Sequence, residues 1–296
     1  MKTANRSYLY AVITVLIWST MAAIVKMMLV DIPNLQMLSI SSFCGVGFLL
    51  VWNTANGTIR KMKRYTLRDY AVMAGLGFIG IFVYSALYYY GLANLSAQEA
   101  CIVNYLWPMM IVLFSCMILR ERLTVLKVVA MVCSFVGIVI LSAGGAEAEN
   151  GNALKGLISC MTAAACYGLF SVLNKKVDYD QNLSMMVVWA VTAVSSLVLG
   201  LATETWVPVR GMQWLGILWI GVVVHALAYL LWAVALNRAE NTAKIANLAY
   251  LTPFLSLLVS AVLLKEKIQA KAFVALLFII GGILVQSVYD RASDQR

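Results

Sequence analysis

An amide and two aromatic side chains stand just before a proline inside a long apolar stretch, Asn104-Tyr105-Leu106-Trp107-Pro108. Proline lacks a backbone N–H, so Pro108 interrupts one helical hydrogen bond and frees carbonyls about one turn earlier, near Asn104. Freed carbonyls, an amide and aromatic faces can hold a ligand that is part polar and part apolar. We therefore predict that Asn104, Tyr105 and Trp107 line a binding site, with Pro108 in a structural role. A kink without a ligand is the alternative, and the two are compatible.

Four tyrosines lie close together upstream of that run. Tyr84 and Tyr88 are four residues apart, so they share one face of a helix, while Tyr89 and Tyr90 point elsewhere. A phenol deep in an apolar segment needs a hydrogen-bond partner and therefore faces protein or a wet cavity. We predict that Tyr84 and Tyr88 line the same site. Tyr89 and Tyr90, near the end of the run, are expected in an interfacial aromatic belt.

Ionisable residues inside or beside apolar runs are candidates for gating or coupling: Lys26, Glu99, Lys175 and His225. The alternatives are that the lysines snorkel to the membrane surface, that Glu99 pairs with a basic group, and that His225 is neutral and hydrogen-bonded. A lone histidine makes no metal site, and we predict neither a metal nor a cofactor.

The composition shows where these residues must be held. Of 296 residues, 62% are hydrophobic and 12% charged, and the mean hydropathy is +0.87. These values exclude a soluble enzyme, a disordered chain and a fibre, and leave an integral membrane protein. Continuous runs of about 20 apolar residues favour helices over the alternating strands of a barrel. The net charge of +9 is carried between those runs, so a lipid bilayer rather than nucleic acid is the expected partner.

Ten helical spans are predicted, with no loop long enough to form a separate domain. They are Tyr8–Leu29, Leu35–Trp52, Tyr70–Gly91, Ala97–Leu119, Leu123–Ala143, Ala153–Asn174, Leu183–Ala202, Met212–Leu236, Thr242–Leu264 and Ala270–Tyr289. With the N-terminus in the cytoplasm, 16 of the 22 basic residues fall on the inside, as the positive-inside rule requires. Both termini are then cytoplasmic. The loop around Lys265 is the exception.

An internal repeat accounts for that exception. The stretch Tyr84–Leu141 matches Tyr229–Gln286 at a constant offset of 145. The matched pairs are Tyr84 with Tyr229, Tyr105 with Tyr250, Pro108 with Pro253, Arg120-Glu121 with Lys265-Glu266, and Gly137 with Gly282. We predict two five-helix halves, residues 1–146 and 147–296. Because five is odd, the second half is inverted, which is the geometry of alternating access.

The repeat also assigns roles in the second half. Tyr250, before Pro253, is predicted to line the binding site across the pseudo-two-fold axis. Pro253 repeats the structural role of the first proline. Glu121 and Glu266 are predicted to brace the tight turns before the fifth and tenth helices by pairing with the helix dipole and adjacent basic residues.

Together these motifs resemble the EamA-type transporters of the drug/metabolite transporter superfamily, and the resemblance covers the whole chain. Its carriers are Ile17-Trp18-Ser19-Thr20 with Lys26, Asn104-Tyr105-Leu106-Trp107-Pro108, Arg120-Glu121-Arg122-Leu123-Thr124 with Gly137, Thr252-Pro253, Lys265-Glu266-Lys267 and Gly281-Gly282. The resemblance implies ten helices, cytoplasmic termini, and transport of small metabolites, commonly export across a bacterial inner membrane.

A narrower resemblance is to the aromatic amino acid exporters of that family, carried by Trp18-Ser19-Thr20, Glu99, the Asn104–Pro108 run and Asn174-Lys175. It implies that Tyr84, Tyr88, Tyr105 and Trp107 line a central cavity. The second half matches less well. We expect a transporter that exports a small amphipathic metabolite such as an amino acid, and not an enzyme. A membrane-embedded enzyme and a non-transporting scaffold or sensor are the alternatives. The substrate, the direction, proton coupling and the oligomeric state stay open.

Overall fold

The computed structural model describes residues 2–120, 124–142, 152–239, 245 and 247–294, and the regular structure of this part of the chain is helical. The all-α prediction is confirmed. Long apolar runs adopt helices because a helix satisfies every backbone N–H and C=O within its own segment, as lipid requires.

The first half contains five helical passes, several of them interrupted. They comprise α1 (Lys2–Ser19) with α2 (Met21–Met28), α3 (Asn34–Ala55), α4 (Leu67–Gly77) with the π-helical η2 (Phe78–Val83) and α5 (Tyr84–Asn94), α6 (Ala97–Asn104) with α7 (Trp107–Ile118), and α8 (Val125–Ser142). A short 3₁₀ segment, η1 (Thr58–Arg64), connects α3 to α4.

The second half repeats this order. Its passes are α9 (Ala153–Asn174), α10 (Gln181–Thr203), α11 (Gln213–Leu218) with the π-helical η3 (Trp219–Leu227) and α12 (Ala228–Asn237), η4 (Leu248–Leu251) with α14 (Thr252–Leu263), and α15 (Ala270–Asp294). The expected division at residues 146 and 147 falls outside the described residues.

Seven segments of the described chain are long and apolar enough to cross a membrane. Three shorter apolar helices, Val125–Leu141, Leu248–Leu263 and Ala270–Gly282, lie where the fifth, ninth and tenth spans are predicted. The count of ten therefore rests on seven long helices and three shorter ones.

The predicted bend at the first proline is confirmed. Helix α6 ends at Asn104, Tyr105 and Leu106 form the break, and α7 begins at Trp107 with Pro108 in its first turn. The same arrangement recurs 145 residues later, where the 3₁₀ turn η4 precedes α14 and Pro253 occupies its first turn. The first break lies within its pass, between α6 and α7.

The turns after these two passes share an unusual backbone conformation. Arg120 has a φ of 57° and Lys265 a φ of 56°, and they are the non-glycine residues of the described chain with a left-handed φ. Few side chains adopt this region. Finding it at two positions 145 residues apart shows that the repeat extends from the sequence to the backbone.

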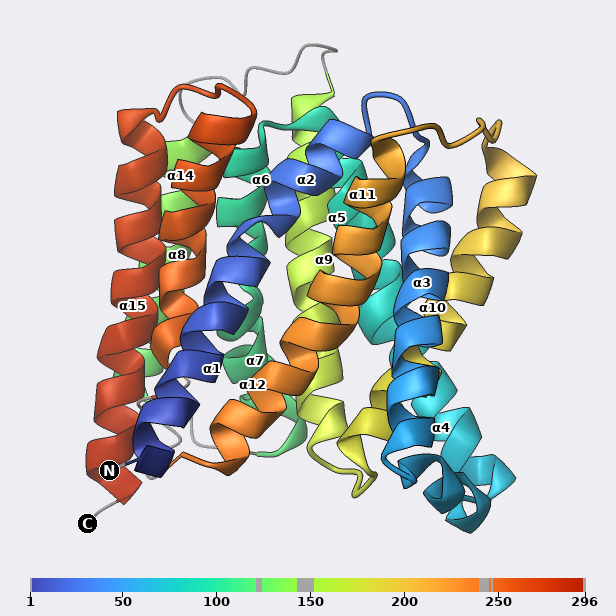
Figure 1. The fold of residues 1–296 in the computed structure, drawn as a ribbon. Helices are drawn as coiled ribbons and strands as arrows, with labels where there is room; N and C mark the ends of the chain where they lie inside the picture. Colours follow the sequence, from blue (N-terminus) through green and yellow to red (C-terminus); the bar gives the residue numbers. More distant parts are fainter. Residues whose placement is uncertain (1, 121–123, 143–151, 240–244, 246, 295–296) are drawn as a thin grey trace.

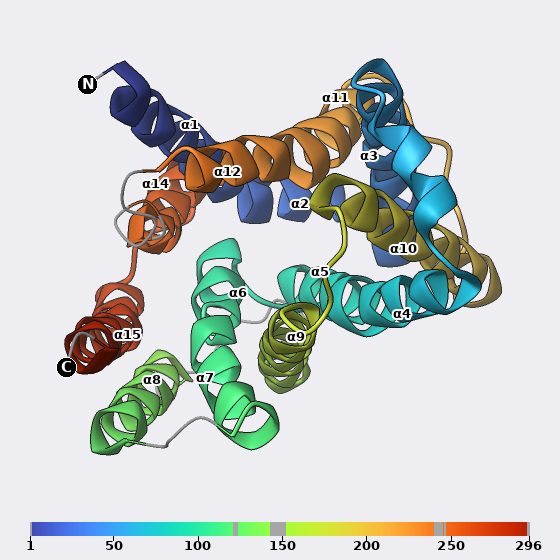
Figure 2. The ribbon, with the colours of Figure 1, turned by 90° about the horizontal axis from the view of Figure 1, so that it is seen from below.

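The two halves pack on each other reciprocally, as two copies related by a two-fold axis do. Helix α3 packs against α10, α8 against α15, α5 against α9, and α1 against α12. Seen along the bundle, α8 and α15 lie together at one corner, α3 and α10 at another, and α6 and α7 lie toward the middle (Figure 2).

The bundle has two distinct ends. Helix α1 begins and α15 ends at the lower end in Figure 1, which we call the termini end. The short helices α2, α6 and α11 lie toward the upper end, which we call the opposite end (Figure 1).

Candidate substrate cavity

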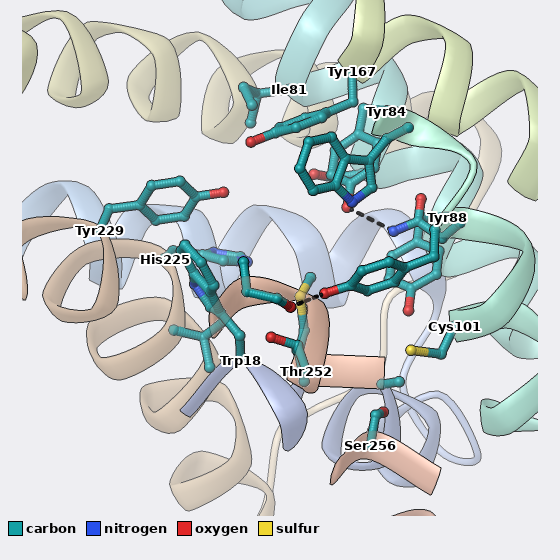
Figure 3. Close-up of a pocket in the computed structure, with 18 of the residues that line it drawn as sticks. Trp18, Ile81, Tyr84, Tyr88, Cys101, Tyr167, His225, Tyr229, Thr252 and Ser256 are labelled. Carbon is teal, nitrogen blue, oxygen red and sulfur yellow. Dashed lines mark hydrogen bonds between the residues drawn. The ribbon is translucent and has the colours of Figure 1, made fainter. Parts of the chain in front are cut away.

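A cavity of about 180 Å³ lies in the interior of the bundle and takes residues from both halves. This is room for roughly a dozen water-sized volumes of about 15 Å³ each, enough for a small metabolite. Figure 3 shows its side chains converging from helices far apart in the sequence. Its lining comprises Trp18, Met21, Ala22, Ile81, Tyr84, Ser85, Tyr88, Cys101, Asn104, Tyr105, Trp107, Tyr167, Trp189, Val224, His225, Tyr229, Trp232, Ala249, Thr252 and Ser256.

The first half supplies a wall with fixed hydroxyl and amide groups. The rings of Tyr84 and Tyr88 lie 6.0 Å apart and nearly parallel, as their spacing on one helix face predicts. The Asn104 Nδ2 donates to the Tyr84 hydroxyl at 3.2 Å. The Tyr105 hydroxyl donates to the backbone carbonyl of Ala249 at 2.8 Å and so joins the two halves.

Aromatic rings continue this wall into the second half. The Tyr167 ring lies 5.1 Å from that of Tyr84 and 5.4 Å from that of Trp107, the latter edge to face. Across the cavity, Trp18 lies 5.4 Å from Tyr229 and 5.3 Å from Trp232. Edge-to-face and tilted contacts of this length are favourable, so the rings hold one another in place.

The polar part of the lining is neutral in residue type. It consists of hydroxyls, amides, indoles and one imidazole, and the lining residues given above include no Asp, Glu, Lys or Arg. The His225 ring is stacked on that of Trp189, with centroids 3.9 Å apart and planes 16° from parallel. Such a surface can bind apolar and hydrogen-bonding groups.

The structure brings together five of the six residues predicted to bind substrate. Tyr84, Tyr88, Asn104, Tyr105 and Trp107 all line the cavity, and their role in binding stays a prediction.

The sixth residue, Tyr250, packs against the hydrophobic core and is outside the lining. The second half lines the cavity here through Ala249 and Thr252, which are the repeat partners of Asn104 and Trp107.

The two lysines predicted to act in gating, Lys26 and Lys175, have different surroundings. The ammonium of Lys26 donates to the carbonyls of Leu92 and Leu95 at 3.1 and 2.6 Å, at the C-terminus of α5, where a cation is favourable. Lys175 is exposed at the end of α9. Both lie away from the cavity lining.

Glu99 is buried in the first turn of α6 rather than in the cavity. Its carboxylate accepts from the Ser96 backbone and hydroxyl, forming a capping box. The ammonium of Lys271 lies 3.8 Å from it.

Glu266 caps a helix of the other half. Its carboxylate accepts from the backbone N–H groups of Ala97 and Gln98 at 2.7 and 3.2 Å, so it pairs with the dipole of α6. The expected pairing with its own tenth helix is wrong, because α15 begins only at Ala270. Glu121 lies outside the described residues.

Two further side chains lie where the sequence did not predict them. Tyr89 is fully buried rather than interfacial, whereas Tyr90 is 36% exposed. Glu204, which drew no attention in the sequence, accepts from the backbone N–H groups of Leu35 and Gln36 at 3.0 Å and caps α3 as Glu266 caps α6.

Several lining residues escaped the sequence analysis. Tyr229 could have been found, since it is the repeat partner of Tyr84. Trp18 and Tyr167 are 149 residues apart, the offset that also relates Lys26 to Lys175. Trp189 carries no such signal.

The family model of EamA-like transporters matches the chain twice, over residues 5–143 and again over residues 154–288. The chain belongs to the EamA-like transporter family. It is therefore a multi-pass membrane transporter of small molecules. The two matches correspond to the two halves that pack reciprocally.

Other EamA-like proteins are similar over most of their length. The uncharacterized transporter YvbV of Bacillus subtilis is 26% identical, covering 97% of this chain and 93% of the relative. The aromatic amino acid exporter YddG of Ancylobacter novellus is 28% identical, covering 73% of this chain and 75% of the relative. A crystal structure superposes with a TM-score of 0.68 at 23% identity over 97% of this chain and 98% of that chain, which shows a shared fold.

Proposed function

We propose that this EamA-like transporter exports a small amphipathic metabolite, an amino acid in particular, by alternating access through the central cavity. The observation that carries the proposal is the cavity lining, which combines aromatic rings with hydroxyl, amide and imidazole groups from both halves. Apolar faces suit a hydrophobic side chain, and the neutral polar groups suit its head. The likeness to a protein named as an aromatic amino acid exporter supports the same substrate class.

The moving units of this mechanism are the two halves, residues 1–146 and 147–296. The halves are joined at the termini end, where Lys61 pairs with Asp180 and the Tyr65 hydroxyl accepts from the Asp180 backbone N–H. They are also joined at the opposite end, where Glu266 and Glu204 cap helices of the first half and Gln36 exchanges two bonds with the backbone of Val207. We interpret the opposite end as the closed gate of the described state. Breaking the bonds of that end would let the cavity open there.

The proposed orientation places the termini end in the cytoplasm of a bacterial cell, with the chain in the inner membrane. The distribution of basic residues supports it, since Arg60, Lys61, Lys63 and Arg64 lie in η1 at the termini end. The opposite end is then the periplasmic gate.

The proposal is tested by reconstituting the purified protein in liposomes with a panel of amino acids and related metabolites, with and without a pH gradient. We expect flux of aromatic or large aliphatic amino acids above that of protein-free liposomes. A dependence on the gradient would identify proton coupling, and its absence facilitated diffusion. Lack of flux for every member of the panel would overturn the proposal.

A further inference from the structure

One stacked pair of side chains stands apart from the rest of the cavity lining. His225 lies in η3 and Trp189 in α10, so two separate helices of the second half meet here. The pair is almost fully buried, with His225 1% exposed and Trp189 3% exposed. Both residues nevertheless line the cavity, so a ligand within it, rather than bulk solvent, would meet this pair.

The backbone behind His225 is held closely by α3. A Cβ added to Gly45 would lie 2.7 Å from the carbonyl oxygen of Gly221 and 3.5 Å from the Cβ of His225. Only glycine permits this approach, which leaves η3 no room to retreat from the cavity. With α3 on one side and the Trp189 ring against its face, the imidazole has a fixed orientation.

The polar atoms of this pair have no hydrogen-bond partner among the described residues. This holds for both ring nitrogens of His225 and for the indole nitrogen of Trp189. A buried polar group without a partner costs about 1–3 kcal/mol, so native proteins rarely retain one without a role. Three such atoms on two stacked rings at a cavity wall point to a ligand group that bonds to them.

The pair also breaks the symmetry of the cavity. The offset of 145 places Gly80 opposite His225 in the first half, four residues before the matched stretch begins. Gly80 has no side chain, and its α-carbon lies against the ring of Phe170. The first-half wall therefore has no imidazole at this position, and the imidazole of the lining belongs to the second half.

We propose that His225 and Trp189 form the subsite for the carboxylate of the substrate, an inference that rests on the proposed transport of amino acids. The indole N–H of Trp189 can only donate, and a neutral imidazole offers one further N–H. A carboxylate only accepts, and bonds from neutral donors to an ionised acceptor are shorter and stronger than neutral pairs. The lining residues of the described chain include no Lys or Arg that could take the carboxylate instead.

The first-half wall then contacts the rest of the substrate, its ammonium group and side chain. The Asn104 Oδ1 is a buried acceptor without a partner among the described residues, while its Nδ2 is bonded to Tyr84. An acceptor suits an ammonium group, and the surrounding rings suit an apolar side chain. The substrate is thus oriented with its carboxylate toward the second half.

The test compares ligands that differ only in the carboxylate: phenylalanine with phenethylamine, and leucine with isoamylamine. Binding is measured on the purified full chain by calorimetry. Trp189→Phe keeps a stacking ring but removes the N–H, and His225→Leu removes both nitrogens. We expect each to weaken binding of the amino acids roughly tenfold to a hundredfold, the value of a hydrogen bond to a charged group, with little change for the amines.

Two variants separate recognition from packing. His225→Gln retains a donor and an acceptor and is expected to keep most of the preference for the amino acid. Trp214→Phe makes the same replacement at a tryptophan that is 44% exposed in α11, and serves as the matched control. Each variant is first checked for a single elution peak and an unaltered melting temperature.

The binding results distinguish failure of the carboxylate subsite from failure of the proposed function. Equal weakening of amino acids and amines, or no weakening of either, would overturn the carboxylate subsite and leave the proposed transport intact. An unaltered protein that neither binds nor transports any amino acid would overturn the proposed function, and this subsite with it.

Discussion

The two halves of this transporter share the backbone features of the repeat but only part of their cavity walls. Positions that shape the chain recur at an offset of 145: a proline in the first turn after each helix break, and a left-handed residue in each following turn. Several positions that face the cavity differ at the same offset, although Tyr84 and Tyr229 agree. The first half has Asn104 and Trp107 where the second has Ala249 and Thr252, and His225 lines the cavity where the first half has Gly80.

This difference indicates that the two kinds of position carry different functions. Two matched halves must bend at equivalent places to interconvert the inward-open and outward-open states. The bends and turns of the two halves must therefore be alike. An asymmetric substrate needs unequal walls, so the lining residues of the two halves must differ. Substitutions at repeat-related positions can test this distinction between backbone-shaping and cavity-lining positions. Each substitution in one half can be compared with the substitution at the equivalent position of the other half.

The largest effect is expected at Trp107. Replacing it by alanine removes a ring that packs against Tyr105 and Tyr167 on the first-half wall. Truncating such an aromatic anchor is expected to reduce flux in proteoliposomes at least about tenfold. The counterpart Thr252→Ala should reduce it far less, since it removes only a small polar group. Unchanged uptake and efflux in Trp107→Ala, with normal membrane insertion, would remove this residue from the site.

The sequence predicted the architecture well because the physical signals are strong. In lipid, the backbone N–H and C=O groups must hydrogen-bond within the chain, which requires helices here. Pro108 and Pro253 locate the breaks in two of these helices. The spacing of Tyr84 and Tyr88 placed both on the cavity.

What escaped prediction depends on contacts between halves. Glu204 and Glu266 cap helices more than 160 residues away in the chain, which no local pattern reveals. The repeat alignment sets Tyr250 against Tyr105, but only Tyr105 lines the cavity while Tyr250 packs against the hydrophobic core, so equivalent positions in the chain have different surroundings.

A second comparison concerns stability. Lys26 and Lys175 occupy related positions, but only Lys26 donates to two described carbonyls, while Lys175 is exposed. Lys26→Met keeps the apolar stem and should lower the free energy of unfolding by about 1.5–3 kcal/mol, since the bonds it loses are charge-assisted. Lys175→Met should change it by no more than about 0.5 kcal/mol. Denaturant unfolding in detergent micelles measures both. Similar losses in the two variants would show that the lysines are equivalent after all.

The smallest effect concerns the bond that joins the halves at the cavity. The Tyr105 hydroxyl donates to the Ala249 carbonyl, the position that corresponds to Asn104 in the other half. Tyr105→Phe keeps the ring and removes only this bond, so unfolding should become easier by about 0.5–1.5 kcal/mol. Tyr90→Phe, at an exposed ring, is the matched control in the same unfolding assay. If the bond must break for the halves to separate, its loss should also speed exchange between the two open states and raise the rate of substrate counterflow. A slower counterflow would instead show that Tyr105 contributes its hydroxyl to the substrate, and the first-half wall would then be more polar than the second.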